Sequence, residues 1–193
     1  MWRYGSINAL GYAHVLSFLA RHGEAFYPNQ SFNGLLNRLV RNGSNLQWRD
    51  FEFPPEHAGV AAGTTIALAI LATLAWYIPR RTAGAGTVVD LCIAALTLTM
   101  TAPIAWEHHY GVMLPIYAAV TPRLLGDRRS GPMTAAALAV SFVIAGNYWP
   151  QTNRFATSDW NVLQSYVLAA ALMLLVLLYR ALHAAESCGP ATA

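Results

Sequence analysis

The segment 103–110 is where the sequence concentrates groups that could do chemistry. It reads Pro-Ile-Ala-Trp-Glu-His-His-Tyr, so a carboxyl group and two imidazoles follow one another between two apolar runs. Ionisable side chains beside such runs are costly to bury, which makes them candidates for function. Glu107, His108 and His109 could move protons or stabilise a negative charge, and Trp106 flanks them. The alternative is a wetted hairpin tip with no chemical role.

We do not expect the histidine pair to bind a metal. Adjacent residues on an α-helix face different directions, and a histidine pair four residues apart is absent. The two cysteines, Cys92 and Cys188, form no spacing motif either. We therefore expect no metal and no cofactor.

A second polar motif, Asn-Gln-Ser at positions 29–31, lies in the N-terminal part of the chain. Amide groups both donate and accept hydrogen bonds, so Asn29, Gln30 and Asn33 could bind the polar groups of a ligand. Ser31 is a suitable N-cap for a helix that follows it. The motif therefore combines a helix start with a cluster of amides.

Two arginines follow this motif at positions 38 and 41. Residues three apart lie on one face of a helix, so Arg38 and Arg41 would point the same way. Guanidinium groups hold a phosphate through paired hydrogen bonds. The pattern fits a phosphate site as well as it fits an ordinary amphipathic helix on lipid head groups.

The composition predicts a membrane protein. Of the 193 residues, 55% are hydrophobic and 11% are charged, whereas an ordinary soluble domain has about 25% charged residues. The net charge of +3 is too small to indicate a nucleic-acid surface, so we expect no nucleic-acid partner. All twelve basic residues are arginine, which with the many alanines suggests a GC-rich bacterial genome.

The apolar runs predict an all-α fold with about five transmembrane helices. A lone strand or loop leaves backbone polar groups unsatisfied in lipid, so each run is interpreted as a helix. The predicted spans cover about 58–78, 87–105, 109–122, 132–149 and 161–180. They form a transmembrane domain over 58–181, which a tail at 182–193 follows.

Arginine positions predict the orientation. The connections after the first and third spans are rich in arginine, whereas the alternate connections hold only Arg154. Basic loops stay in the cytoplasm, so the tail 182–193 is cytoplasmic and residues 1–57, 106–109 and 150–161 share the periplasmic face of a bacterial inner membrane. On this topology Cys92 and Cys188 face the inner side and form no disulfide.

The first 57 residues are more polar than the rest and predict an outer-face segment of short amphipathic helices, one of them near 9–19. They contain no apolar signal sequence, although the arginine pattern places them outside. We therefore expect further spans to precede Met1 in the complete protein.

Together the two motifs resemble glycosyltransferase family 87, which contains bacterial polyprenyl-phosphate-mannose-dependent α-mannosyltransferases. The resemblance covers nearly the whole chain but only the C-terminal half of the family. The matching residues are Asn29, Gln30, Ser31, Gly34 and Arg38, then Pro103, Trp106, Glu107, His108, His109, Leu114 and Pro115.

The resemblance implies a GT-C-type membrane enzyme that moves a hexose, mannose in this family, from a polyprenyl-phosphate donor to a glycolipid or glycan acceptor with inversion. Membrane lipids are the other expected partners. The catalytic base is implied in a first outer loop that has no counterpart in this chain. Substrate-binding residues are then expected at Asn29, Gln30, Ser31, Asn33, Arg38, Trp106, Glu107, His108 and His109.

Two other classes of function remain open. A transporter subunit could use Glu107 and the histidine pair as a polar gate, but transporters often show internal repeats and ionisable residues in several spans. A non-catalytic membrane protein could bind a lipid-linked sugar without transferring it. The absence of the implied base leaves this second alternative in place.

Overall fold

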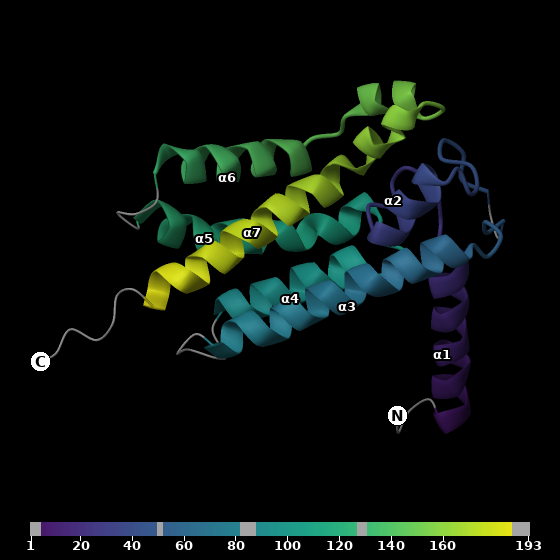
Figure 1. The fold of residues 1–193 in the computed structure, drawn as a ribbon, viewed down its shortest axis with the longest axis horizontal. Helices are drawn as coiled ribbons and strands as arrows, with labels where there is room; N and C mark the ends of the chain where they lie inside the picture. The colour runs from purple at the N-terminus through teal and green to yellow at the C-terminus, as the bar shows by residue number, and fades with distance from the viewer. Residues whose placement is uncertain (1–4, 50–51, 82–87, 127–130, 187–193) are drawn as a thin grey trace, which may run out of the picture.

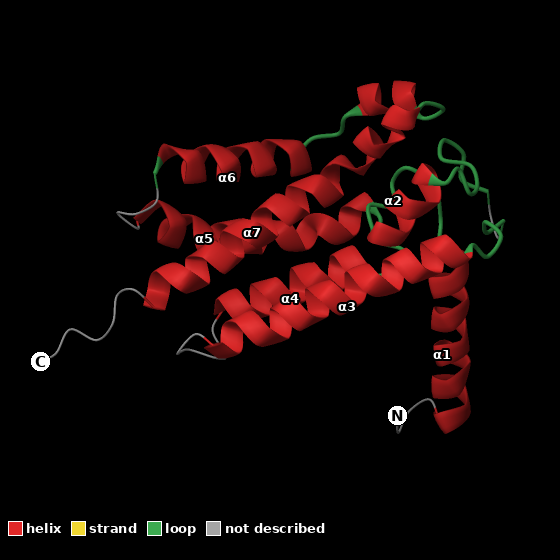
Figure 2. Cartoon of the chain, viewed as in Figure 1, coloured by secondary structure: helices red, strands yellow, loops and turns green. Residues whose placement is uncertain are grey.

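The computed structural model describes residues 5–49, 52–81, 88–126 and 131–186, and within these ranges the chain is helical without a strand (Figure 2). This confirms the all-α prediction. Helices α3 to α7 run side by side along the long axis of the molecule (Figure 1). Their bounds are Ala58–Arg81 (α3), Val88–Thr101 (α4), Met113–Gly126 (α5), Pro132–Ala145 (α6) and Tyr166–Glu186 (α7).

Two described segments are long and apolar enough to span a membrane, Ala58–Ile78 and Asp159–Leu182. The apolar helices Val88–Thr101 and Pro132–Ala145 are shorter than the predicted spans 87–105 and 132–149. Each predicted run therefore contains a helix, but five full crossings are not confirmed. One physical reason is Pro103, which lacks an N–H and disfavours helical backbone at the residue before it. The predicted tail begins inside α7, which continues to Glu186.

Helix α7 forms the centre of the bundle and packs against α4, α5 and α6. Its residues Ala170, Ala171, Leu174 and Leu178 are completely buried. Alanines on a packed face let neighbouring helices approach closely, which favours packing in a membrane as in water. From α4 and α5, the fully buried side chains of Ile93, Leu96, Met100 and Val120 complete this core.

The polar segments gather at one end of the bundle (Figure 1). Here lie α2 (Phe32–Leu39), the start of α3, and the short 3-10 helices η1 (Glu107–Val112), η2 (Pro150–Phe155) and η3 (Asp159–Ser165). The C-terminal ends of α3, α5 and α7 lie at the opposite end. The two sequence motifs therefore occupy the same end of the molecule.

Helix α1 (Gly5–His22) projects from this end of the bundle, at a steep angle to α3 (Figure 1). It includes residues 9–19, where the sequence predicts a helix. Its apolar side chains Leu10, Tyr12 and Val15 are more than half exposed.

A buried hydroxyl joins three helices of the bundle. The Ser141 hydroxyl of α6 donates to the carbonyl of Ala170 in α7 at 2.8 Å, and the Tyr117 hydroxyl of α5 lies 2.7 Å from Ser141 Oγ. All of these groups are buried, so each depends on the others for hydrogen bonding.

Replacing Ser141 by alanine should lower the stability of the bundle, because the Tyr117 hydroxyl loses its partner in an apolar setting. An unsatisfied buried group costs about 1–3 kcal/mol, so we expect the thermal unfolding midpoint in detergent to fall by about 2–10 °C. Adding Tyr117→Phe removes the stranded hydroxyl and should recover part of the loss. An unchanged midpoint for Ser141→Ala would contradict the role of this contact.

Candidate functional site

The two sequence motifs meet in an isolated antiparallel bridge between Asn29 and Trp106. The Gln30 N–H donates to the carbonyl of Ala105 at 2.8 Å, and the Ala105 N–H donates to Asn29 Oδ1 at 3.0 Å. The Tyr110 hydroxyl donates to the Gln30 carbonyl at 2.7 Å. The N-terminal segment 23–39, here called the leader, and the segment 103–110, here called the hairpin, therefore form one structural unit.

Asn29 and Ser31 both bind the carbonyl of Pro103, which lies two residues after the end of α4. Asn29 Nδ2 lies 3.3 Å from this oxygen and Ser31 Oγ lies 3.2 Å from it. Ser31 Oγ also accepts from the N–H of Gly34 at 3.1 Å, which confirms the predicted N-cap of α2. One serine thus starts a helix and holds the hairpin.

Gln30 connects the leader to the first turn of α7. Its Nε2 donates to the carbonyls of Tyr27 and Gln164, both at 2.7 Å. Its Oε1 accepts from the N–H groups of Val167 at 3.1 Å and Leu168 at 3.5 Å. The first N–H groups of a helix have no partner within the helix, so the Gln30 side chain supplies one.

Arg38 is 1% exposed and holds the leader together from inside. Its guanidinium donates to the carbonyls of Asn29 at 2.9 Å and Phe26 at 3.3 Å, and to Ser165 Oγ at 2.6 Å. Burial lowers the pKa of Arg38 to about 9, and attraction to the carboxyl group of Glu24 opposes this shift. The guanidinium therefore stays protonated at neutral pH. Its hydrogen bonds go to protein groups rather than to a ligand.

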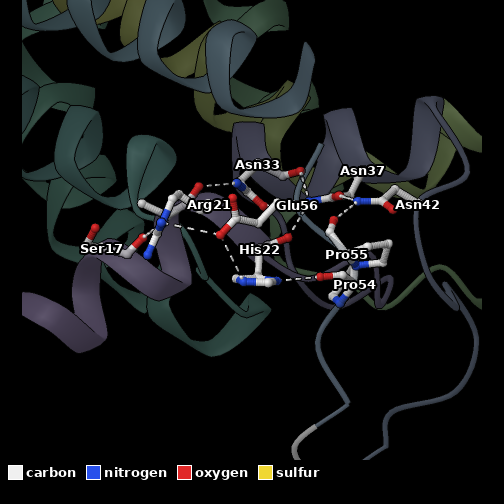
Figure 3. A network of polar contacts seen from close by, with 10 residues as sticks. Ser17, Arg21, His22, Asn33, Asn37, Asn42, Pro54, Pro55 and Glu56 are labelled. Carbon is white, nitrogen blue, oxygen red and sulfur yellow. Dashed lines mark hydrogen bonds and ion pairs between the residues drawn. The ribbon is translucent and has the colours of Figure 1, made fainter. Parts of the chain in front are cut away.

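Asn33 belongs to a ladder of amides that fixes the end of α1 against α2 (Figure 3). Its Oδ1 accepts from Asn37 Nδ2 at 2.7 Å, and Asn37 Oδ1 accepts from Asn42 Nδ2 at 2.8 Å. Its own Nδ2 donates to the carbonyl of Ala20 at 3.4 Å, while His22 bonds the carbonyl of Pro54 at 2.7 Å. Asn33 is fully buried in this network.

The predicted binding residues of the leader are thus 0–1% exposed, and their side chains hydrogen-bond protein groups. These residues are Asn29, Gln30, Ser31, Asn33 and Arg38. In this structure they position the backbone, and their contact with a ligand stays a prediction. Short amide and hydroxyl side chains reach neighbouring backbone more readily than a distant ligand. This explains why these side chains, predicted to bind a ligand, hydrogen-bond the protein instead.

Arg41 does not share a helix face with Arg38, so that prediction is wrong. Helix α2 ends at Leu39, and Arg41 has a left-handed backbone with φ 56°. The turn signals Asn42 and Gly43 follow it directly. Arg41 instead forms an exposed ion pair with Asp159 at 2.9 Å.

The hairpin presents its ionisable groups outward. His108 and His109 are exposed, and their rings lie 4.3 Å apart between centroids at 32°. The segment forms the 3-10 helix η1 rather than an α-helix. Glu107 is half-buried, and its Oε1 accepts from the Tyr166 hydroxyl of α7 at 2.6 Å. These groups are the part of the predicted site that a ligand can reach.

Sequence reasoning missed Glu24, which lies directly behind Trp106. Glu24 is 9% exposed, and its Oε2 accepts from Trp106 Nε1 at 2.7 Å. Burial raises the pKa of Glu24, while the hydrogen bonds from the indoles of Trp106 and Trp48 and the charge of Arg38 oppose this shift. No spacing motif marks this acid, because its partner lies 82 residues away in the chain.

An apolar groove of about 620 Å³ runs along α5 and α6. It starts at Leu114, just after η1, and extends along α5 to Leu125. Tyr117 and Phe142 lie within it, with Leu138 on the α6 side. An acyl or prenyl chain is the kind of ligand that such a lining accepts.

No family model matches the chain, and no curated protein or solved structure matches it. The site therefore rests on its own geometry and on the resemblance of its motifs.

Replacing Gly34 by alanine should disrupt the joined motifs. The added Cβ would lie 2.3 Å from the Asn29 carbonyl oxygen, so the backbone of the bridge has to move. We expect the thermal unfolding midpoint in detergent to fall by several degrees, since the overlap involves backbone and cannot be relieved by a rotamer change. Gly111→Ala is the matched control, because its Cβ would meet open space. Equal midpoints for the two variants would contradict this packing.

Proposed function

We propose that this chain is the C-terminal part of an integral-membrane glycosyltransferase that moves a hexose, mannose by resemblance, from a polyprenyl-phosphate donor to a glycolipid or glycan acceptor. The observation that carries the proposal is the bridge between Asn29 and Trp106. It joins the two motifs of the resemblance, which are far apart in the sequence. The joined unit bears His108 and His109 at the surface, next to the start of an apolar groove.

The proposal places the joined motifs at the periplasmic face of the bilayer. Helices α3 and α7 would cross the membrane. The shorter helices α4, α5 and α6 would pack beside them and cover the rest of the membrane thickness together with the segments at their ends. The aromatic side chains of Tyr148, Trp149 and Trp160 are exposed at the motif end, where an interface belt would lie.

In this proposal the hairpin handles the charge of the leaving phosphate. A departing polyprenyl phosphate gains negative charge, which fixed donors in a poorly hydrated site stabilise. His108 and His109 are the exposed donors, and Tyr166 holds Glu107 beside them. The groove along α5 and α6 would hold the prenyl chain. The base that activates the acceptor hydroxyl is assigned, by resemblance, to a first outer loop.

A second candidate function is the binding of a lipid-linked sugar without transfer. It is favoured by the buried state of the leader, because the predicted amide and guanidinium groups already hydrogen-bond the protein. In that case the groove and the hairpin bind a donor-like lipid, and no glycosidic bond is broken. A binding protein would retain polyprenyl-phosphate mannose on the membrane without forming product.

Replacing His108 or His109 by alanine should lower sugar transfer. Loss of one donor to a developing negative charge costs about 100-fold in rate. The measurement is transfer of radiolabelled mannose from polyprenyl-phosphate mannose by membranes in which the chain is extended upstream to include the first outer loop that supplies the base. His14→Ala is the control, since His14 is exposed on α1. Full transfer by both hairpin variants would remove the histidines from the site, and retention of the donor without any transfer by the upstream-extended chain would favour the second candidate.

Single cysteines should reveal the proposed orientation. Ser44→Cys and Gly111→Cys lie at exposed positions of the motif end, and Gly126→Cys lies at the far end of α5. In a background without Cys92 and Cys188, we expect an impermeant maleimide to label the first two in intact cells and to spare the third. Labelling of positions 44 and 111 from opposite sides would rule out a shared pocket.

A further inference from the structure

A cavity of about 450 Å³ lies beside the joined motifs and is not used by the proposed leaving-group chemistry. The loop between α2 and α3 forms most of its wall, and Glu24 and Phe26 close it from the leader. This volume falls in the range of about 300–1,000 Å³ typical of small-molecule sites. The remaining walls come from Ala25, Gly43, Ser44, Gln47, Trp48, Arg49, Glu52, Phe53, Pro54 and Pro55.

Aromatic rings and one buried carboxyl group define the chemistry of this cavity. Trp48 is 51% exposed, so its ring remains available to a ligand. It meets Trp106 edge to face, with ring centroids 5.9 Å apart. Trp106 in turn donates to Glu24, which places the carboxyl group at the wall of the cavity. The edge-to-face contact fixes the orientation of both indoles.

Polar groups on the rim complete the lining without adding an unpaired charge. Arg49 and Glu52 form an ion pair at 3.1 Å, and Ser44 and Gln47 add a hydroxyl and an amide. Attraction between Glu24 and the buried Arg38 offsets the charge of the carboxyl group. A phosphate would meet Glu24 at close range, which disfavours an anion here.

We infer that this cavity binds a neutral hexopyranose ring, with Trp48 against its C–H face and Glu24 accepting a hydrogen bond from a hydroxyl group. The face of an aromatic ring is electron-rich and attracts the polarised C–H groups of a sugar. A carboxylate offers about four acceptor positions, of which the indoles of Trp106 and Trp48 use two. Ser44 and Gln47 supply the further donors and acceptors that a ring with several hydroxyl groups needs.

This site deepens the proposed function, because it gives the acceptor glycan a place next to the hairpin. The aromatic series Trp48, Trp106 and His108 links the cavity to the exposed histidines, with successive ring centroids 5.9 Å apart. Identifying the sugar as the acceptor rests on the proposed function. Binding of the ring itself does not, so the two can fail separately.

The test is direct binding of methyl α-D-mannopyranoside to the full chain in detergent micelles, followed by ligand-observed NMR. Trp48→Ala should weaken binding about tenfold, because the stacking face is lost. Glu24→Gln should weaken it by a similar factor of about ten, since a hydrogen bond to a charged acceptor is replaced by a neutral one. Trp160→Ala and Glu56→Gln are the matched controls, because both residues are exposed and neither lines the cavity.

The outcomes distinguish sugar binding at the cavity from sugar transfer and from a folding defect. Weakened binding in both cavity variants, with unchanged controls and unchanged unfolding midpoints, supports the site even where no transfer is detected. Trp48→Phe, which keeps an aromatic face, should retain most of the binding and shows that the loss is not a folding defect. Absence of mannoside binding to the native chain, equal binding by Trp48→Ala, or preferential binding of choline in a cation–aromatic cage would overturn the inference.

Discussion

Buried amide groups impose the constraint on which the site depends. A polar group removed from water must find a partner, and Asn29, Gln30 and Ser31 are fully buried. Their side chains and backbone find these partners in the hairpin at Pro103 and Ala105 and in the first turn of α7. Because few other arrangements satisfy so many groups at once, this contact fixes where the leader, the hairpin and the central helix meet.

The result is a division of roles between two motifs that are adjacent in space. The leader motif is turned inward and orders the backbone, whereas the hairpin turns His108 and His109 outward. Arg38 illustrates the first role, since carbonyls and a serine occupy its terminal nitrogens. Glu107 combines both roles, because it is half-buried and accepts a hydrogen bond from Tyr166 while it lies beside the exposed histidines. A side chain held by a rigid support keeps its geometry without a conformational step.

The sequence predicted local features well. Apolar runs located the helices, and the Ser31 cap followed from the preference of serine for that position. Helix ends were harder, since Pro103 and the left-handed Arg41 stop helices inside runs that look continuous. Glu24 could not be found at all, because its significance comes from Trp106, which only the folded chain brings near. Whether the amides of the leader point outward or inward also depends on tertiary contacts that a single sequence does not contain.

The Gln30 side chain has a mechanical consequence for the molecule. It hydrogen-bonds both the carbonyl of Gln164 and the N–H groups at the start of α7. The backbone N–H of Gln30 also donates to Ala105 of the hairpin. Any tilt of the central helix is therefore transmitted to the surface on which the histidines lie. In the proposed membrane setting, forces that a bilayer exerts on α7, through its thickness or lateral pressure, would reach the hairpin through Gln30 and through the contact of Tyr166 with Glu107.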